Sequence, residues 1–274
     1  MDILVLGGDK RSVYAARELG KRHSVTIYAL GEYNEIPDKK FDCAVLGLPC
    51  SRDGENIHAP MFDEKIPIKS VPRFVKSGGI VAGGMIKPVL RAVCRENHIF
   101  CEDYYDDETV ILKNAVPSAE GALAAGIYGT AGQIMGMRVL VTGYGRIASL
   151  LARYLTALGA KVTIAARSAE KRALAEVNGC AAVDFTELKN IIDRFALIYN
   201  TVPAAVLHDE EISRISSDAV YIELASASGL DRFAAQHYNV NIINAQGLPS
   251  KTAPAAAGEI IADAVQRILN KYSN

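Results

Sequence analysis

The sequence twice repeats one pattern, in which a short apolar run is followed by glycine and then by a stretch of helical periodicity. The first copy lies at residues 3–8, with a helix expected at about 11–19. The second copy lies at 139–143, with a helix expected at about 146–158. Short apolar runs bounded by glycine are typical of strands buried on both faces of a parallel sheet. Two such starts predict two α/β domains.

The alternation of strands and helices continues after both starts. Further helices are predicted at 169–177 and 187–195. Apolar strand candidates lie at 25–28, 43–46, 80–82, 98–100, 161–164, 181–183, 197–199, 220–222 and 240–243. Strands that alternate with helices form parallel sheets with right-handed crossovers. The predicted fold is therefore α/β, with two Rossmann-like parallel-sheet domains joined by a long connecting helix.

The boundary between the domains is marked by small side chains. Residues 117–132 are rich in alanine and glycine, start with Pro117-Ser118 and carry Glu120 in the first turn, which predicts a closely packed helix. A second long helix is expected at 253–271. We therefore expect an N-terminal domain for substrate or partner binding at 1–115, joined by the C-terminal helix 253–274. The nucleotide-binding domain, including the connecting helix, is expected at 116–252.

Composition argues against several functions. The formal net charge of −1 offers no basic surface for nucleic acid. No apolar run reaches the ~20 residues of a membrane span, and the first residues do not form a signal peptide. The 5 cysteines show no C-x-x-C spacing, which indicates reduced thiols rather than disulfides or a metal site. We expect a cytoplasmic protein that binds no metal, nucleic acid or membrane.

The second glycine turn matches the dinucleotide fingerprint G-x-G-x-x-G/A with Gly143, Gly145 and Ala148. The first glycine makes the tight turn, the second lets a pyrophosphate approach the backbone, and the third small residue lets helix and strand pack closely. The helix N-terminus favours the phosphates electrostatically. The alternative is a strand-to-helix turn without a ligand. The predicted cofactor contacts here are Gly143, Tyr144, Gly145, Arg146 and Ile147.

The end of the next strand indicates which dinucleotide binds. NAD-specific sites carry an Asp or Glu about 20 residues after the glycine turn. The strand at 161–164 leads instead to Arg167-Ser168, and Lys171 and Arg172 follow one turn later. A guanidinium can pair with a 2′-phosphate, and a hydroxyl can donate a hydrogen bond to it. This pattern favours NADP over NAD, with Arg167, Ser168 and Lys171 as contacts. The alternative for Arg167 is an exposed residue at a helix start.

Two later strands are followed by loops at the same edge of the predicted sheet. Ligands of open α/β sheets bind at the carboxyl ends of the strands. Thr201, Val202 and Pro203 follow the strand at 197–199 and are expected to flank a ribose of the cofactor, although plain loop chemistry is the alternative. Ser226 follows the strand at 220–223 and is a candidate substrate contact near the nicotinamide.

The first glycine turn lacks the full fingerprint. Its sequence Gly7-Gly8-Asp9 places an acid where it would repel a pyrophosphate, so we predict no second dinucleotide site there. Arg11, at the start of the following helix, is a candidate for holding a substrate carboxylate. An ordinary surface arginine is an equally good interpretation.

No Ser-His-Asp set, metal-spaced cluster or P-loop stands out. Hydride chemistry needs none of these, because the cofactor supplies the reactivity. The catalytic candidates are Ser118 and Glu120, at the start of the connecting helix, and Lys251, in the Gly- and Pro-rich stretch 244–254. Asn244 is a candidate substrate contact. Lys251 can bind a carboxylate or donate a proton, and the alternative is a solvated lysine.

Five blocks of sequence together resemble the family of dipicolinate synthase A subunits. They are Gly7-Gly8-Asp9-x-Arg11, NAVPSAEGA at 114–122, Gly143-Tyr144-Gly145-Arg146, ELAS at 223–226 and GLPSKTAP at 247–254. The resemblance runs from end to end, and the second and fifth blocks are much more specific than the glycine turn. Two loops depart from the family pattern. Ser250 stands where the family often has glycine, and ASGL at 227–230 replaces a Lys-Pro-Gly-Gly-like run.

The resemblance implies an activity that composition cannot. The family oxidises dihydrodipicolinate, a lysine-pathway intermediate, to dipicolinate in sporulating bacteria, in the cytoplasm of the mother cell. It acts with a flavoprotein-like B subunit. The resemblance thus implies NADP as hydride acceptor and a small dicarboxylate substrate, which suits the cationic Arg11 and Lys251. A homo-oligomer is a further expectation.

Two alternatives stay open. The chain is a nucleotide-binding scaffold whose partner carries the catalytic groups, or it is a stand-alone NADP-dependent dehydrogenase of another small carboxylate. The layout also resembles 2-hydroxyacid, alanine and shikimate dehydrogenases at the level of the fold.

Overall fold

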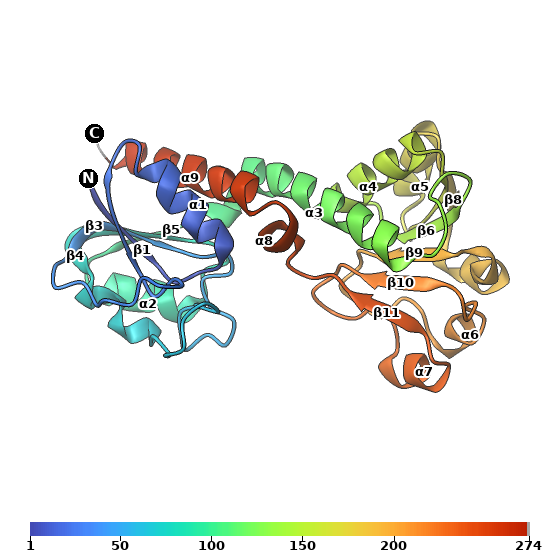
Figure 1. Cartoon of the computed structure of the whole chain (residues 1–274), viewed down its shortest axis with the longest axis horizontal. Coiled ribbons are helices and arrows are strands. Elements are labelled where there is room, and N and C mark those ends of the chain that lie inside the picture. Colours follow the sequence, from blue (N-terminus) through green and yellow to red (C-terminus); the bar gives the residue numbers. More distant parts are fainter. Residues whose placement is uncertain (273–274) are drawn as a thin grey trace. The chain divides into compact units, whose positions relative to one another are not determined.

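The computed structural model describes residues 1–272 (Figure 1). Within them the chain divides into two compact units. Unit 1 contains residues 1–114 and the chain from 249 onward, and unit 2 contains residues 115–248. The return to unit 1 therefore comes slightly earlier than the expected 253. The last two positions of the expected segment 253–274 lie outside the described residues.

Unit 1 is built on a parallel sheet with the strand order β2-β1-β3-β4-β5. This is the flavodoxin-like order, in which the direction of winding reverses between the first and third strands. The strands are β1 (Asp2–Leu6), β2 (Ser24–Tyr28), β3 (Phe41–Leu46), β4 (Val75–Gly83) and β5 (Phe100–Asp103). The helices are α1 (Lys10–Leu19), α2 (Pro88–Glu96), α8 (Leu248–Thr252, mostly in this unit), α9 (Pro254–Lys271) and the 3-10 helices η1 (Ile68–Arg73) and η2 (Tyr104–Asp106).

The last helix completes the core of unit 1. Figure 1 shows α9 running alongside α1. Ile261 and Val265 of α9 are buried in one cluster with Ile3 and Val5 of β1. The two helices approach closely at Gly258, where an added Cβ would lie 2.6 Å from the carbonyl oxygen of Arg11. The chain thus returns to its first sheet to cover it.

Unit 2 is built on a second parallel sheet, with the order β11-β10-β9-β6-β7-β8. Its first strand, β6, pairs with both β7 and β9, which is the Rossmann arrangement. The strands are β6 (Arg138–Thr142), β7 (Lys161–Ala165), β8 (Ala181–Val183), β9 (Leu197–Asn200), β10 (Val220–Glu223) and β11 (Asn241–Asn244). The helices are α4 (Arg146–Ala157), α5 (Ala169–Val177), α6 (Asp209–Ile212), α7 (Arg232–His237) and the 3-10 helices η3 (Phe185–Asn190) and η4 (Ile192–Arg194).

Both faces of this sheet are buried. Val139 and Val141 pack into one cluster with Leu151 of α4. Leu140, which points the other way, packs into a second cluster with Ile192 of η4. Successive side chains of a strand point to opposite faces, so a continuous apolar strand requires a layer on each side. The two parallel α/β sheets confirm the predicted fold class.

The connecting helix α3 (Glu108–Gly129) starts earlier than expected. Asp107 accepts a hydrogen bond from the backbone N–H of Thr109 at 2.8 Å, an arrangement that stabilises a helix start. Pro117, where we expected the helix to begin, lies inside it and removes one intrahelical hydrogen bond. The expected start was wrong because the Asp107 cap was not recognised. The chain passes from unit 1 into unit 2 within α3.

Three smaller expectations also need correction. The predicted helix 187–195 consists of η3 and η4, because Asp184 and Glu187 form a capping box around a tight 3-10 turn. The strand expected at 98–100 begins only at Phe100, because His98 has φ +54° and belongs to a turn. The stretch 244–254, expected as a loop, contains α8.

All five cysteines are free; four are buried and Cys101 is partly exposed. Burial raises the pKa of the Cys43 thiol to about 12. Among the described residues, no group of three or more His, Cys, Asp or Glu side chains is placed to hold a metal ion. No helix of the described chain combines the length and the apolar character that a membrane span needs.

Candidate nucleotide-binding site

The second glycine turn links β6 directly to α4. Gly143 has φ +84°, in the left-handed region that favours glycine. Its N–H donates to the carbonyl oxygen of Ala165 at 2.8 Å. An added Cβ would lie 2.7 Å from Oγ1 of Thr201, so space as well as conformation requires glycine here.

Gly145 is different, because an added Cβ would meet no atom within 4 Å. Gly145 is also the N-cap of α4 and brings no side chain to cap it. An open space at a helix N-terminus suits a phosphate group, so the turn fits the pyrophosphate of a dinucleotide. Ala148, the third small residue of the fingerprint, is completely buried beneath the turn.

Tyr144, between the two glycines, is buried, whereas the two residues after Gly145 are more exposed. The side chain of Tyr144 is turned into the core with 6% exposure, and its hydroxyl accepts a hydrogen bond from Nδ2 of Asn178 at 3.3 Å. Burial raises the pKa of this phenol. Tyr144 can therefore serve a cofactor through its backbone only. Arg146 is exposed and Ile147 is half-buried.

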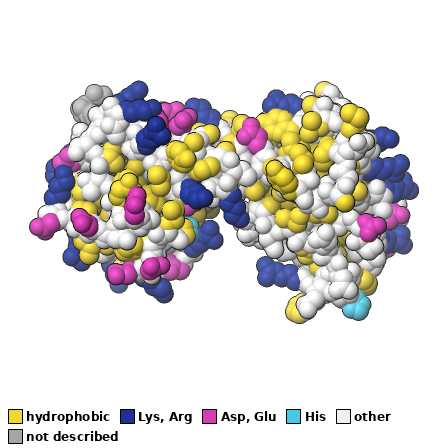
Figure 2. Space-filling view, in the orientation of Figure 1, with side chains coloured by type: hydrophobic (Ala, Val, Ile, Leu, Met, Phe, Trp, Pro, Cys, Tyr) yellow, Lys and Arg dark blue, Asp and Glu magenta, His cyan; other side chains and the backbone are white. Residues whose placement is uncertain are grey.

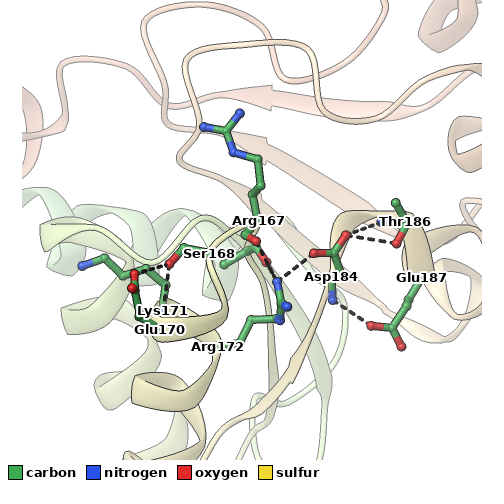
Figure 3. A network of polar contacts seen from close by, with 9 residues as sticks. Arg167, Ser168, Glu170, Lys171, Arg172, Asp184, Thr186 and Glu187 are labelled. Atoms are coloured by element: carbon green, nitrogen blue, oxygen red, sulfur yellow. Dashed lines mark hydrogen bonds and ion pairs between the residues drawn. The ribbon is translucent and has the colours of Figure 1, made fainter.

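The loop after β7 carries the groups predicted to select the cofactor. Arg167 is exposed, and in Figure 3 its side chain points away from the surrounding polar network. Ser168 caps α5, accepting from the N–H of Lys171 at 3.3 Å. Its hydroxyl also donates to Oε2 of Glu170 at 3.0 Å. The exposed Lys171 belongs to the same turn. The end of β7 itself carries no acid, but the carboxylate of Glu170, two residues after Ser168, contacts the Ser168 hydroxyl.

Arg172 does not share the outward position of Arg167. Its guanidinium donates to Asp184 and to two backbone carbonyls of the same loop. The basic cluster expected from the sequence is therefore divided. Arg167 and Lys171 are exposed, whereas Arg172 is engaged within the protein.

The loop after β9 lies beside the glycine turn, as its place in the sheet order requires. The N–H and the hydroxyl of Thr201 both donate to the carbonyl oxygen of Thr142, at 3.2 and 2.7 Å. Val202 is half-buried and Pro203 is exposed. The structure thus brings Thr201, Val202 and Gly143 together at one edge, where the side chains of both loop residues lie close to Gly143.

A buried polar network at this edge was missed by the sequence analysis. Glu223 is 3% exposed and Asn200 is completely buried. Oε1 of Glu223 accepts from Nδ2 of Asn200 at 2.7 Å and from the N–H of Ala225 at 3.0 Å. Oε2 accepts from the N–H of Gly229 at 2.8 Å and from the hydroxyl of Tyr221 at 3.3 Å. The carboxylate thus fixes the loop after β10.

The signal for this network was present in the sequence. Three apolar strands, β6, β9 and β10, end in Thr142, Asn200 and Glu223. Thr142 belongs to the network because its hydroxyl donates to Oδ1 of Asn200 at 2.5 Å. A polar residue that ends a buried strand lies at the ligand-binding edge of a parallel sheet. Burial, followed by the charge of Glu223, raises the pKa of Tyr221, so the phenol stays protonated and donates to the carboxylate.

The two substrate candidates of unit 2 lie near this network. Asn244 ends β11 and lines a cavity of about 570 Å³ with Glu223 and with Arg232 of α7. Ser226 is exposed in the loop after β10 and is not among the residues that line the cavity. The cavity is separate from the glycine turn, because neither Gly143 nor Gly145 lines it.

The remaining candidates are divided between the units. Ser118, with 8% exposure, and the exposed Glu120 both lie on the unit 2 part of α3. Lys251 is exposed on α8 in unit 1. Arg11, also in unit 1, is buried, and its Nε and Nη2 donate to the Asp9 carboxylate at 2.9 and 2.8 Å. Its Nη2 also contacts the carbonyl oxygen of Leu48. Arg11 is therefore buried, and its guanidinium already has a carboxylate partner in Asp9.

Comparison with known proteins agrees with this description of the two units. Residues 2–105 match the family of N-terminal domains of the dipicolinate synthase A subunit. Residues 119–237 match "D-isomer specific 2-hydroxyacid dehydrogenase, NAD binding domain". The dipicolinate synthase A subunit of Bacillus subtilis (strain 168) is 25% identical, and the alignment covers 98% of this chain and 96% of that protein. The chain is a relative of the dipicolinate synthase A subunit. The family resemblance noted in the sequence is confirmed.

Solved structures show the same fold. The crystal structure of the dipicolinate synthase A subunit from Bacillus halodurans has a TM-score of 0.85 at 23% identity, covering 98% of this chain and 97% of that one. An L-alanine dehydrogenase has a TM-score of 0.71 at 12% identity, covering 100% of this chain and 90% of that one. This relative of the dipicolinate synthase A subunit therefore carries, in unit 2, a dehydrogenase-type domain for a nicotinamide cofactor.

Proposed function

We propose that the chain is the A subunit of a dipicolinate synthase that oxidises dihydrodipicolinate to dipicolinate during sporulation, with NADP as hydride acceptor. One observation carries the choice of cofactor. The Rossmann unit with the open Gly145 presents an exposed Arg167, directed away from its neighbours, at the end of β7. The relatives named as dipicolinate synthase A subunits support the choice of reaction.

The residues of unit 2 would hold the cofactor in three places. The backbone at Gly143, Gly145 and Ile147 would receive the pyrophosphate at the start of α4. Arg167, Ser168 and Lys171 would bind the 2′-phosphate, where a planar guanidinium offers two parallel hydrogen bonds. The hydroxyl of Ser168 would release Glu170 in order to donate to the phosphate. Thr201, Val202 and Pro203 would flank a ribose, and Tyr144 and Arg146 would contribute to the turn. When bound, the nicotinamide accepts the hydride.

The proposed substrate groups are the remaining candidates from the sequence. Lys251, Glu120 and Ser118 are the proposed catalytic groups, and Asn244 and Ser226 are the proposed substrate contacts. Of the two cations, the exposed Lys251 suits a substrate carboxylate better than Arg11, whose guanidinium is already paired with Asp9. Arg11 would contribute to a dicarboxylate site only through guanidinium N–H groups that are not already donated to Asp9 or Leu48.

The surface of unit 2 supports association with a partner B subunit or with a second copy. In Figure 2, hydrophobic side chains gather over α3 and α4. Exposed hydrophobic residues include Ile127, Tyr128 and Leu158, and Tyr128 is 89% exposed. Exposed apolar patches of this kind are typical of interaction surfaces.

The choice of cofactor is tested by titrating the purified chain with NADPH and NADH and following nicotinamide fluorescence. We expect preference for NADPH, and Arg167→Ala should weaken NADPH binding at least about tenfold, or 1.4 kcal/mol. Glu170→Ala should act in the opposite direction, because it removes a negative charge next to Ser168. A preference for NADH would overturn the NADP assignment, and no binding of either would overturn the cofactor site.

The reaction is tested with dihydrodipicolinate and NADP, for the chain alone and with the B subunit. Nucleotide reduction by the chain, alone or with its partner, supports the proposal when Lys251→Ala abolishes it without changing NADPH affinity. If the B subunit oxidises the substrate at the same rate without this chain, the catalytic groups lie on the partner, and the scaffold alternative replaces the proposal. If only other carboxylates are oxidised, it is a different dehydrogenase.

A further inference from the structure

The loop that carries Arg167 and Ser168 is held by one arginine. Nη1 of Arg172 donates to the carbonyl oxygen of Ala166 at 2.7 Å and to that of Arg167 at 2.9 Å. The same nitrogen lies 2.7 Å from Oδ2 of Asp184. Figure 3 shows these three contacts meeting at a single guanidinium, between the end of β7 and the segment that follows β8.

Asp184 is itself fixed on the opposite side. Its Oδ1 accepts from the backbone N–H and the hydroxyl of Thr186, at 3.1 and 3.0 Å. Its own N–H donates to Oε1 of Glu187 at 2.9 Å. Hydrogen bonds from Thr186, followed by the charge of Arg172, lower the pKa of the Asp184 carboxyl, so it stays ionised at neutral pH. The guanidinium therefore contacts a carboxylate that has little freedom to move.

The backbone ties the same two segments together. The N–H of Ala166 donates to the carbonyl oxygen of Val183 at 3.1 Å. The side chains of Arg172 and Asp184 are 26% and 31% exposed, so the pair is partly shielded from water. Arg167, in contrast, is exposed and points away from this network. The loop thus has a fixed inner side and an outer side that faces solvent.

We propose that Arg172 and Asp184 are positioning residues for cofactor selection, which hold the backbone of residues 166–168 so that Arg167 and Ser168 can meet the 2′-phosphate. This inference rests on the proposed NADP site. Arg172 is not itself a phosphate ligand in this scheme, although it is part of the basic cluster. Its nitrogen nearest the loop is already shared among three acceptors. Asp184 acts through Arg172.

The Asp184→Asn substitution separates positioning from direct contact, because the two roles predict opposite signs. Asparagine caps a helix as well as aspartate does, so the start of η3 is retained and only the charge is lost. If Arg172 positions the loop, the ratio of NADPH affinity to NADH affinity falls by about threefold or more. If Arg172 binds the phosphate directly, freeing it from Asp184 raises that ratio by more than Glu170→Ala, which also removes one negative charge beside the loop, and overturns the proposal.

A double-mutant cycle with Arg167 distinguishes an effect on cofactor selection from a general loss of structure. Arg172→Ala alone should lower the NADPH-to-NADH affinity ratio about tenfold. In an Arg167→Ala background the same change should have a much smaller further effect, because most of its action passes through Arg167 and only the contact of Ser168 remains. Independent, additive losses would overturn the proposal. Arg172→Lys should restore part of the ratio, since an ammonium can still reach Asp184.

Arg214→Ala is the matched control. Arg214 also lies in unit 2 and donates to a backbone carbonyl outside the residue 166–168 loop, that of Lys189 at 3.1 Å. Its loss removes the same charge and one similar hydrogen bond, so the affinity ratio should stay unchanged. An equal fall in Arg214→Ala and Arg172→Ala would show a general charge effect and overturn the positioning role.

Hydrogen exchange keeps the inference testable apart from the proposed function. In the protein without nucleotide, Arg172→Ala should speed amide exchange at residues 166–168 at least about tenfold over Arg214→Ala. Unchanged exchange would overturn the positioning role even if NADPH binds tightly. If Arg172→Ala speeds exchange but the wild-type protein prefers NADH, Arg172 still positions residues 166–168 and only the choice of cofactor is overturned.

Discussion

The two glycine turns begin in the same way and end differently. Each follows the first strand of its sheet, at the point where the winding reverses. In each, the first glycine has a positive φ, and its N–H donates to the end of the second strand. These contacts are Gly7 to Tyr28 at 2.9 Å and Gly143 to Ala165 at 2.8 Å. The two turns therefore share the conformation of the first glycine and its hydrogen bond.

The difference lies in what occupies the helix start. In unit 1 the Asp9 carboxylate caps α1, and the N–H of Gly8 donates to the carbonyl oxygen of His58 at 2.7 Å. In unit 2 the helix starts at Gly145, above which the chain places no atom within 4 Å of a Cβ. Unit 1 thus supplies its own anion and its own acceptor, whereas unit 2 leaves space for those of a ligand. This difference supports the proposal that the turn of unit 2, and not that of unit 1, receives a phosphate.

The largest expected effect concerns the open turn. Gly145 has φ −93°, an extended conformation that valine adopts easily, so Gly145→Val should fold and lose only about 1 kcal/mol of capping. The added side chain would occupy the proposed pyrophosphate position. We expect NADPH and NADH affinity to fall at least about a hundredfold, or 2.8 kcal/mol, in a fluorescence titration. Undiminished affinity would show that the open space is not the phosphate site.

The filled turn should respond through stability instead. Gly8 has φ +93°, and an added Cβ would lie 2.0 Å from Oγ and 2.9 Å from Cβ of Ser12. We therefore expect Gly8→Ala to lower the free energy of unfolding by about 2 kcal/mol, measured in urea, with unchanged nucleotide affinity.

Gly54→Ala is the control for Gly8→Ala. Gly54 has a similar φ of +80°, but its Cβ would meet nothing within 4 Å. This variant should lose only the conformational part of the stability, about 1 kcal/mol. If the two substitutions lower the free energy of unfolding equally, Ser12 does not occupy the space beside Gly8 as we describe. The two turns would then not differ in this way.

The comparison also explains how far the sequence could be interpreted. The strands were predictable because both sheets are covered on both faces, which requires unbroken apolar runs such as that of β6. The turn at Gly143 and Gly145 was predictable because the conformational demands of a strand-to-helix glycine turn are local. The helix start at Glu108 was missed because the small residues near Pro117 gave a stronger signal than the single cap at Asp107.

Features that depend on neighbours from distant segments were not predictable. Arg172 looked like Lys171 in sequence, and only the placement of β8 beside β7 brings Asp184 to it. Glu223 meets Asn200 because β10 pairs with β9 in a register that sets the two side by side. Likewise, Arg11 is buried not only by its local pairing with Asp9 but also by its contact with the carbonyl oxygen of the distant Leu48.

The smallest expected effect tests whether Asp9 is the anion of the first turn. Burial alone would raise the pKa of this carboxyl, but hydrogen bonds and charge from Arg11 outweigh it and hold the pKa below its ordinary value. A lowered folded-state pKa stabilises the protein above the unfolded pKa, and this stabilisation is lost as pH falls through the folded value. Wild type should therefore lose about 1 kcal/mol more than Asp9→Asn on acidification from about pH 5 to about pH 3.

The measurement is the urea midpoint as a function of pH. Gly145→Val is the matched control, because it alters the other turn without removing a carboxylate, and its slope with pH should equal that of wild type. If Asp9→Asn also keeps the wild-type slope, the carboxylate does not stabilise the start of α1. The first turn would then be closed to phosphate only by the loop that contains His58. A steeper slope in wild type than in Asp9→Asn would show that the chain supplies in unit 1 the negative charge that unit 2 leaves to its ligand.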